Sequence, residues 1–212
     1  PKNVLFHADR TPAWQIVARR LTDGEELWRI ELAGGLQTGY RNVFTADERS
    51  VYAFACQEQQ GRLLAFDPAH GAERWWAPIG GPMSTAVASD GTRLFVEGQR
   101  EQLVSLNSAT GEEAWRTSIP GGGNRCPPIV IGGHLVGFRG ADIYVVDIDA
   151  RKMADVIRMP NPAGIFSYLA YHDGIVYAVN GALIVTLRNA SCEGETVIAD
   201  TPDASAFGSS RK

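Results

Sequence analysis

The chain has 212 residues, of which 44% are hydrophobic and 21% charged, and its formal net charge is −4 at pH 7. Twenty-three glycines and 11 prolines indicate a globular protein with many turns. Nucleic-acid binding needs a strongly basic face that displaces phosphate counterions, so the acidic balance argues against a nucleic-acid partner. No apolar run approaches the roughly 18 residues of a membrane-spanning helix, and the first ten residues do not resemble a signal peptide.

Short apolar segments separated by Gly, Asn and Asp turns predict β-strands along the whole chain, without helical periodicity. The first unit contains NVLFHA, WQIVARR and ELWRIE, and the second opens with NVFTAD and VYAFA. The third unit runs through STAVAS, LFVEG, LVSLN and AWRTSI, and the fourth through PPIVI, HLVGF, DIYVVD and ADVIRM. The fifth unit contains FSYLAY, IVYAV, ALIVTL and a weaker ETVIAD.

The units repeat at a period of forty residues. The same slot is filled by LLAF at 63–66, LVSL at 103–106, IYVV at 143–146 and LIVT at 183–186. Four antiparallel strands in about forty residues are typical of a β-propeller blade. We therefore predict one all-β domain over 1–212, with about five four-stranded antiparallel blades at 1–33, 40–79, 83–120, 127–160 and 165–200.

The first unit lacks its inner strand, which leaves two arrangements open. In one, the tail at 201–212 supplies that strand and closes a ring of five blades, because propellers usually complete one blade from both chain ends. In the other, the five blades are part of a larger ring of seven or eight blades. Only Phe207 gives the tail apolar character.

Three units share a glycine followed four residues later by a tryptophan. We expect each glycine to occupy a turn that needs a positive φ, and each tryptophan to open the outer strand and dock on the next blade with its indole N–H on a backbone carbonyl. The pairs are Gly24 and Trp28, Gly71 and Trp75, and Gly111 and Trp115.

The stretches LLAFDPAHGAERWW, LVSLNSATGEEAW and RLTDGEELW resemble the repeat of pyrroloquinoline-quinone (PQQ) type propellers. The signature is lost in the last two units, where Arg151 and Ser191 replace the glycine and Asp155 and Glu195 replace the tryptophan. The resemblance implies the propeller fold. It also implies roles seen among such proteins, which include quinoprotein dehydrogenases, scaffolds for membrane-protein assembly and kinase sensor domains, and it favours a bacterial, extracytoplasmic setting.

The dehydrogenase alternative requires PQQ, a Ca²⁺ site of several oxygen ligands and a carboxylate base on the propeller axis. The connections expected there, at 32–42, 78–83, 118–128 and 158–166, contain no Asp or Glu. We therefore predict no catalysis, no cofactor and no metal site. Three widely spaced cysteines, Cys56, Cys126 and Cys192, match neither a disulfide framework nor a zinc site.

A group of arginines and polar residues, predicted to lie at one end of the blades, favours a binding function. The connections between blades share a face with the turns between second and third strands, so several arginines and polar residues are predicted to meet at one rim. We expect this mouth to bind a protein or an anionic small molecule through guanidinium groups. A carbohydrate-binding propeller that stacks sugars on Tyr40, Phe166 and Trp76 is a further alternative. The predicted mouth consists of Tyr40, Arg41, Arg100, Asn124, Arg125, Arg139 and Asn180.

Overall fold

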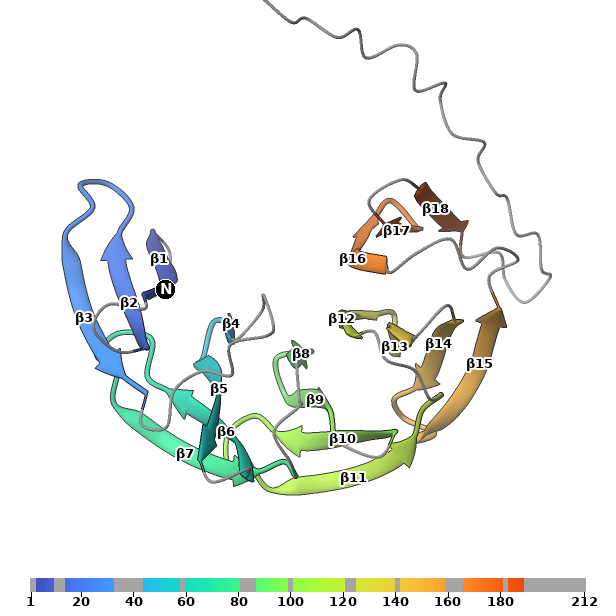
Figure 1. The fold of residues 1–212 in the computed structure, drawn as a ribbon, viewed down its shortest axis with the longest axis horizontal. Helices are drawn as coiled ribbons and strands as arrows, with labels where there is room; N and C mark the ends of the chain where they lie inside the picture. The colour runs from blue at the N-terminus through green and yellow to red at the C-terminus, as the bar shows by residue number, and fades with distance from the viewer. Residues whose placement is uncertain are drawn as a thin grey trace, which may run out of the picture.

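The computed structural model describes residues 3–9, 14–32, 44–57, 60–80, 87–98, 101–120, 125–139, 142–158, 166–180 and 183–188. Within these ranges all regular structure is β-strand, and five antiparallel sheets follow one another along the chain (Figure 1). This confirms the predicted all-β class.

In each sheet the strands lie side by side in chain order. The first sheet has three described strands, the next three sheets have four each, and the fifth has three. Their bounds are β1 (Val4–Asp9), β2 (Gln15–Arg20) and β3 (Glu26–Glu31); β4 (Phe44–Ala46), β5 (Val51–Gln57), β6 (Gln60–Phe66) and β7 (Glu73–Pro78); β8 (Val87–Ser89), β9 (Arg93–Glu97), β10 (Gln102–Asn107) and β11 (Glu113–Ser118); β12 (Arg125–Ile131), β13 (His134–Arg139), β14 (Asp142–Asp147) and β15 (Lys152–Arg158); and β16 (Phe166–His172), β17 (Ile175–Asn180) and β18 (Leu183–Arg188).

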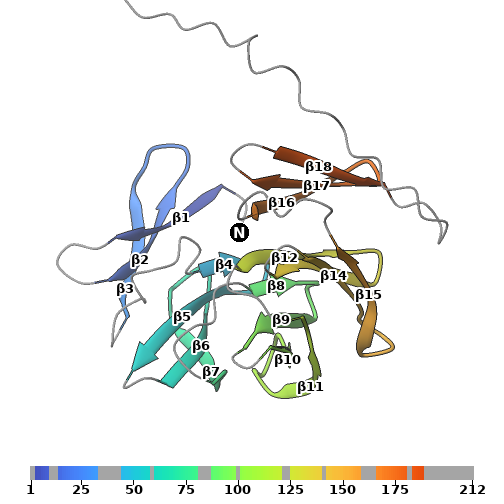
Figure 2. The ribbon, with the colours of Figure 1, turned by 45° about the vertical axis from the view of Figure 1, so that its right-hand side comes forward.

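The five sheets stand next to one another as blades along an open arc (Figures 1 and 2). The inner strands β4, β8, β12 and β16 contact one another in sequence, while β3, β7, β11 and β15 lie on the outside of the arc. The fourth strand predicted at 195–200 and the tail at 201–212 lie outside the described residues. The number of blades and the closure by the tail therefore stay predictions.

The pairing of third and fourth strands has a β-bulge that follows the repeat. The register shifts between Ala65 and Phe66, between Ser105 and Leu106, and between Val145 and Val146. A bulge inserts one extra residue and increases the local twist. The bulge comes just before the turn that carries the docking glycine, so the same local geometry recurs every forty residues.

One strand begins earlier than the sequence predicts. We expected the inner strand of the fourth blade at 127–131, but β12 starts at Arg125 and shifts register between Cys126 and Ile129. Pro127 and Pro128 lie inside this irregular stretch and have no N–H to give to a neighbouring strand. An inner strand can contain them because the ladder is interrupted at that point.

Apolar side chains form a separate core at each boundary between blades. The boundary of the second and third blades buries Leu63 and Ala65 against Leu94 and Val96, and Trp75 packs at its edge. Comparable clusters lie at the other three boundaries. The blades therefore stabilise one another mainly through burial of these faces.

At the outer edge of the first two boundaries a tryptophan locks one blade to the next. The indole N–H of Trp28 donates to the carbonyl of Pro68 at 3.0 Å, and that of Trp75 donates to the carbonyl of Ser108 at 3.1 Å. The indole lies directly over the glycine of the next blade. A Cβ added at Gly111 would come within 2.5 Å of the Trp75 ring.

The glycine position has a positive φ in every blade where the structure describes it. The φ angles are +74° at Gly24, +70° at Gly71 and +75° at Gly111. Arg151 takes this place in the fourth blade and still has a φ of +59°, so the turn is kept without glycine. Trp115 packs in the cluster that contains Ile148 and Met153 of the fourth blade.

Gly111→Ala should lower the free energy of unfolding of residues 1–212 by roughly 2–4 kcal/mol, because the methyl group adds overpacking against the Trp75 ring to the strain of a positive φ. Gly24→Ala is the matched control, since the φ is nearly the same and no described atom lies within 4 Å of its Cβ position. It should cost only about 1–2 kcal/mol. Urea unfolding measures the stability of both variants. Equal losses of unfolding free energy would contradict the role of Gly111 in leaving room for the Trp75 ring.

Candidate functional site

The structure places three residues of the predicted mouth at the same end of their blades. Arg139 and Asn180 end β13 and β17, and Arg125 begins β12. Arg125 is the direct register partner of Arg139, so these two backbones lie side by side. The other four predicted mouth residues, Tyr40, Arg41, Arg100 and Asn124, lie outside the described residues.

The side chain of Arg139 is buried, with an exposed fraction of only 2%. Its Nη1 lies 3.8 Å from Oε2 of Glu97, and its Nε donates to the carbonyl of Pro120 at 3.3 Å. The hydroxyl of Tyr144 donates to Oε1 of Glu97 at 2.5 Å. The guanidinium group of Arg139 is therefore engaged inside the protein, where it ties the third blade to the fourth.

No sequence motif marks Glu97 or Tyr144 as members of this buried network. The one local signal is Gly137 in the middle of a strand, because an interior strand glycine often marks a close approach. A Cβ at Gly137 would lie 2.3 Å from the Tyr144 hydroxyl oxygen. Gly137 thus leaves room for the phenol that reaches Glu97.

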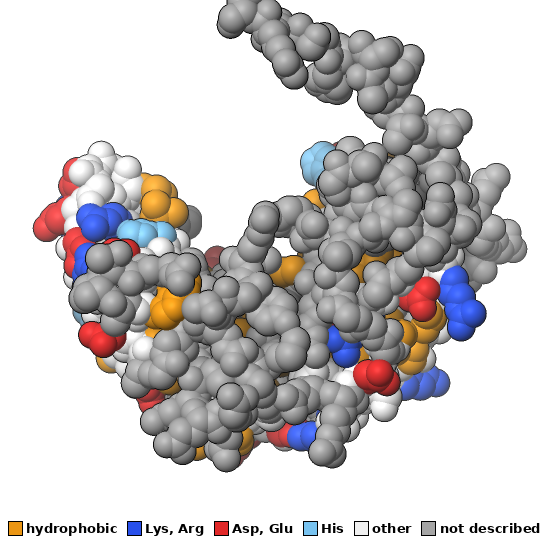
Figure 3. All heavy atoms as spheres, viewed as in Figure 1, with side chains coloured by type: hydrophobic (Ala, Val, Ile, Leu, Met, Phe, Trp, Pro, Cys, Tyr) orange, Lys and Arg blue, Asp and Glu red, His pale blue; other side chains and the backbone are white. Residues whose placement is uncertain are grey.

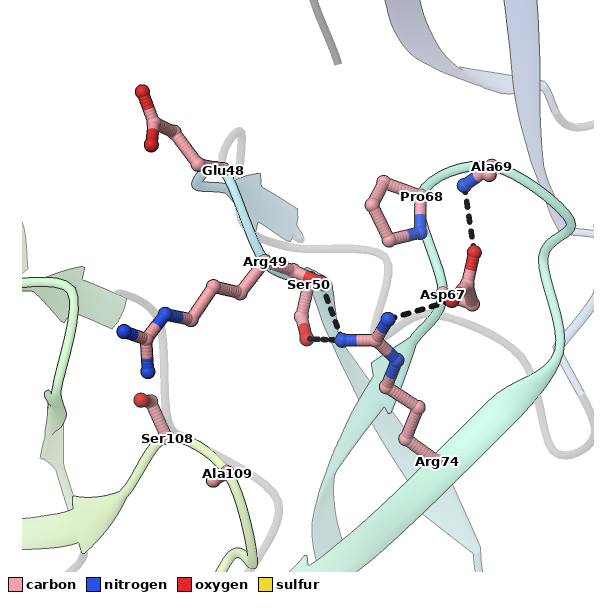
Figure 4. A pocket seen from close by; sticks show the side chains of 9 residues that line it. All are labelled: Glu48, Arg49, Ser50, Asp67, Pro68, Ala69, Arg74, Ser108 and Ala109. Carbon is pink, nitrogen blue, oxygen red and sulfur yellow. Dashed lines mark hydrogen bonds and ion pairs between the residues drawn. The ribbon is translucent and has the colours of Figure 1, made fainter.

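The end of the blades opposite the predicted mouth carries a pocket of about 620 Å³ at the boundary of the second and third blades (Figure 4). Its walls come from the β4–β5 turn, from the β6–β7 turn with the start of β7, and from the β10–β11 turn. A second hollow of about 300 Å³ lies beside the same β4–β5 turn and extends to the β8–β9 turn. The two hollows are lined by Asp47, Glu48, Arg49, Ser50, Asp67, Pro68, Ala69, Arg74, Asp90, Gly91, Thr92, Ser108 and Ala109.

We call these residues together the turn-face groove. One wall is fixed by Arg74, which pairs with Asp67 at 2.5 Å and donates to the carbonyl of Arg49 and the hydroxyl of Ser50. The Arg74 guanidinium and the backbone N–H of Ala69 hold the pKa of Asp67 below its usual range. The Asp67 carboxylate therefore stays charged and bound within the wall at neutral pH.

Asp47 fixes the turn between the two hollows. Its Oδ1 accepts the N–H groups of Arg49 and Ser50, and its Oδ2 accepts the hydroxyls of Ser89 and Tyr52. Burial and the Asp47 carboxylate together raise the pKa of Tyr52 to about 12, so this phenol stays protonated as a donor. The groove is thus shaped by hydrogen bonds that are already formed.

The described residues hold no cluster of three or more His, Cys, Asp or Glu side chains suited to a metal ion. Most of the connections expected around the propeller axis are outside the described ranges, so the prediction that the chain holds no cofactor stays a prediction.

Among the described residues there is no helix that could span a membrane. In the space-filling view, acidic and basic side chains both occur along the outer edge of the arc (Figure 3).

Trp76 is the only one of the three proposed sugar-stacking aromatics whose side chain is described. It lies half exposed on β7, and the guanidinium carbon of Arg62 lies 4.6 Å from its ring centroid. Tyr40 lies outside the described residues, and Phe166 belongs to β16 without a described side chain. The sugar-stacking alternative therefore stays a prediction.

Two solved structures share this fold over most of the chain. BamB from Moraxella catarrhalis matches with a TM-score of 0.63 and 16% identity, over 88% of this chain and 55% of that chain. The computationally designed Ika8 protein matches with a TM-score of 0.58 and 14% identity, over 84% and 52%. At this identity the likeness shows the fold, and with the BamB neighbour it confirms the propeller.

Sequence comparison reaches further than the fold. The outer membrane protein assembly factor BamB of Alkalilimnicola ehrlichii is 30% identical over 78% of this chain and 46% of its own length. The chain thus spans about half the length of the relatives it matches. The Alkalilimnicola relative is named as an assembly factor, which agrees with the prediction that the chain is not an enzyme. The profile of the outer membrane protein assembly factor BamB family matches residues 13–182, so the resemblance to PQQ-type repeats is confirmed and the chain belongs to this family.

Proposed function

We propose that the chain is a non-catalytic propeller module that binds protein partners during outer membrane protein assembly, in an extracytoplasmic compartment of a bacterium. The observation that carries the proposal is the family match over residues 13–182, which covers most of the described blade strands. A propeller suits a scaffold because its rigid sheets present turns from several blades on one surface. The proposal includes that the whole protein binds its partners without a cofactor.

Deletion of the gene that encodes the chain should reduce the amount of folded outer membrane β-barrel proteins in its host, because their assembly loses a scaffold. Gel mobility with and without heating separates folded from unfolded barrels and measures the change. A plasmid copy of the gene should restore the folded fraction. An unchanged folded fraction in the deletion strain would contradict the proposed function.

We further propose that the five blades belong to a ring larger than five. In the second and third blades the docking glycine lies under an indole from the preceding blade, whereas the space over Gly24 is open among the described residues. In a closed ring of five, the fifth blade would bring Glu195 to that position instead of a tryptophan. The open Gly24 position and the half-length coverage of the relatives both favour the larger ring.

This arrangement predicts that Gly24→Ala costs more in the complete gene product than in residues 1–212. A preceding blade with an aromatic side chain over Gly24 would add overpacking of roughly 1–3 kcal/mol to the strain of the turn. Urea unfolding of both proteins gives the difference. An equal cost in the two contexts would favour closure by the tail at 201–212.

The mouth predicted from the sequence remains a proposal for partner recognition. Arg41→Ala with Arg125→Ala should fail to restore folded barrels in the deletion strain, while lowering the melting temperature by no more than about 2 °C. Arg139 is left out of this variant because its side chain is buried against Glu97. Arg116→Ala, which removes an exposed arginine paired with Glu113 on β11, is the control and should restore assembly. Full restoration by the double variant would remove the mouth from the proposal.

A further inference from the structure

The turn-face groove contains one arginine and one glutamate that form no ion pair with the other residues lining it. Glu48 and Arg49 are consecutive, both are exposed, and both line each of the two hollows. No ion pair joins either side chain to another described residue. In Figure 4 the Arg49 guanidinium group extends toward Ser108, and the Glu48 carboxylate lies on the other side of the same turn, where both residues line the groove.

The other charged groups of the groove are occupied. Asp47 and Asp67 accept backbone N–H groups of their own turns, and Asp90 accepts N–H groups of Thr92 and Arg93. Arg74 is bound to Asp67 and to the β4–β5 turn. A ligand in the groove would therefore meet the Arg49 guanidinium as a donor and the Glu48 carboxylate as an acceptor, with the remaining walls already satisfied.

The balance of charge selects between kinds of ligand. Four carboxylates and two guanidinium groups line the two hollows, so a small free anion would be repelled overall. A segment that carries a carboxylate next to a cationic group satisfies Arg49 and Glu48 together. The volume of about 620 Å³ lies in the usual range of ligand sites, and the two hollows together form an elongated shape at a blade boundary.

We propose that the turn-face groove binds an extended peptide segment of a partner protein, with an acidic side chain on Arg49 and a neighbouring basic side chain on Glu48. A carboxylate can accept two parallel N–H bonds from one guanidinium group, which fixes the position and plane of the acidic side chain in the groove. The inference rests on the proposed function only in taking the ligand to be a protein. It adds a second binding surface at the end of the blades opposite the predicted mouth.

The test is a titration of the ¹⁵N-labelled full chain with the peptide Ac-Gly-Ser-Glu-Lys-Ser-Gly-NH₂, followed by amide chemical shifts. Shifts should be confined to the turns around residues 47–50, 67–69, 90–92 and 108–109, and they should weaken as salt is added. The uncharged peptide Ac-Gly-Ser-Gln-Met-Ser-Gly-NH₂ and sodium acetate alone should give much smaller shifts. Acetate shifts as large as those of the charged peptide would show a site for free anions and overturn the proposal.

Arg49→Gln should weaken binding of the charged peptide by about fivefold or more, because the variant removes the charge but keeps most of the side-chain length. Arg116→Gln is the matched control on the outer strand β11 and should bind like the unchanged protein. Equal affinity of Arg49→Gln and the unchanged protein, or no shift at the groove, would overturn the inference. Either result leaves the deletion experiment on barrel assembly unaffected, so the two proposals can fail separately.

Discussion

The docking of the first three blades depends on the contact between an indole ring and a glycine of the next blade. The tryptophan needs a carbonyl for its N–H and a backbone without a Cβ beneath its ring, and one turn supplies both. For Trp75 these are the carbonyl of Ser108 and the α-carbon of Gly111. Because the glycine is also held at a positive φ, the turn geometry and the docking of the blade are set by the same residue.

This contact also determines the shape of the turn-face groove. Pro68 and Ser108, whose carbonyls accept the indole N–H groups of Trp28 and Trp75, are lining residues of the larger pocket. Trp75, which follows the β6–β7 turn on β7, therefore ties this part of the second blade to the β10–β11 turn, while Trp28 ties the β6–β7 turn to the first blade. A binding surface built on such turns is rigid before any partner arrives, which lowers the entropy that binding costs.

The period of forty residues predicts most of the described strands, because each blade repeats the same alternation of apolar runs and turns, while the strand expected at 195–200 lies outside the described residues. The glycine itself predicts the positive φ of the docking turn, although Arg151 shows that the same turn also forms without glycine. The ion pair of Glu97 and Arg139 was not predictable in this way. Its partners belong to different blades, and only the stacking of those blades brings them together.

The groove was missed for a related reason. Its residues come mainly from four turns of two blades, and each turn taken alone resembles an ordinary turn that contains Asp or Asn. Arginines and glycine-rich connections, which favour a binding site in the sequence, gather at the opposite end of the blades. Only the assembled arc shows that Glu48 and Arg49 share one hollow with the β6–β7 and β10–β11 turns.

Hydrogen bonds lower the pKa of several carboxyl groups among the described residues. Arg29 lowers the pKa of Glu26, Arg74 that of Asp67 and Arg116 that of Glu113, and the backbone N–H of Ala150 lowers that of Asp147.

Such carboxylates remain charged and hold turns and strands in place. Their charges are bound within the fold and stabilise it. Partner recognition then depends on charged side chains without such internal contacts, and at the groove the described pair of this kind is Glu48 and Arg49.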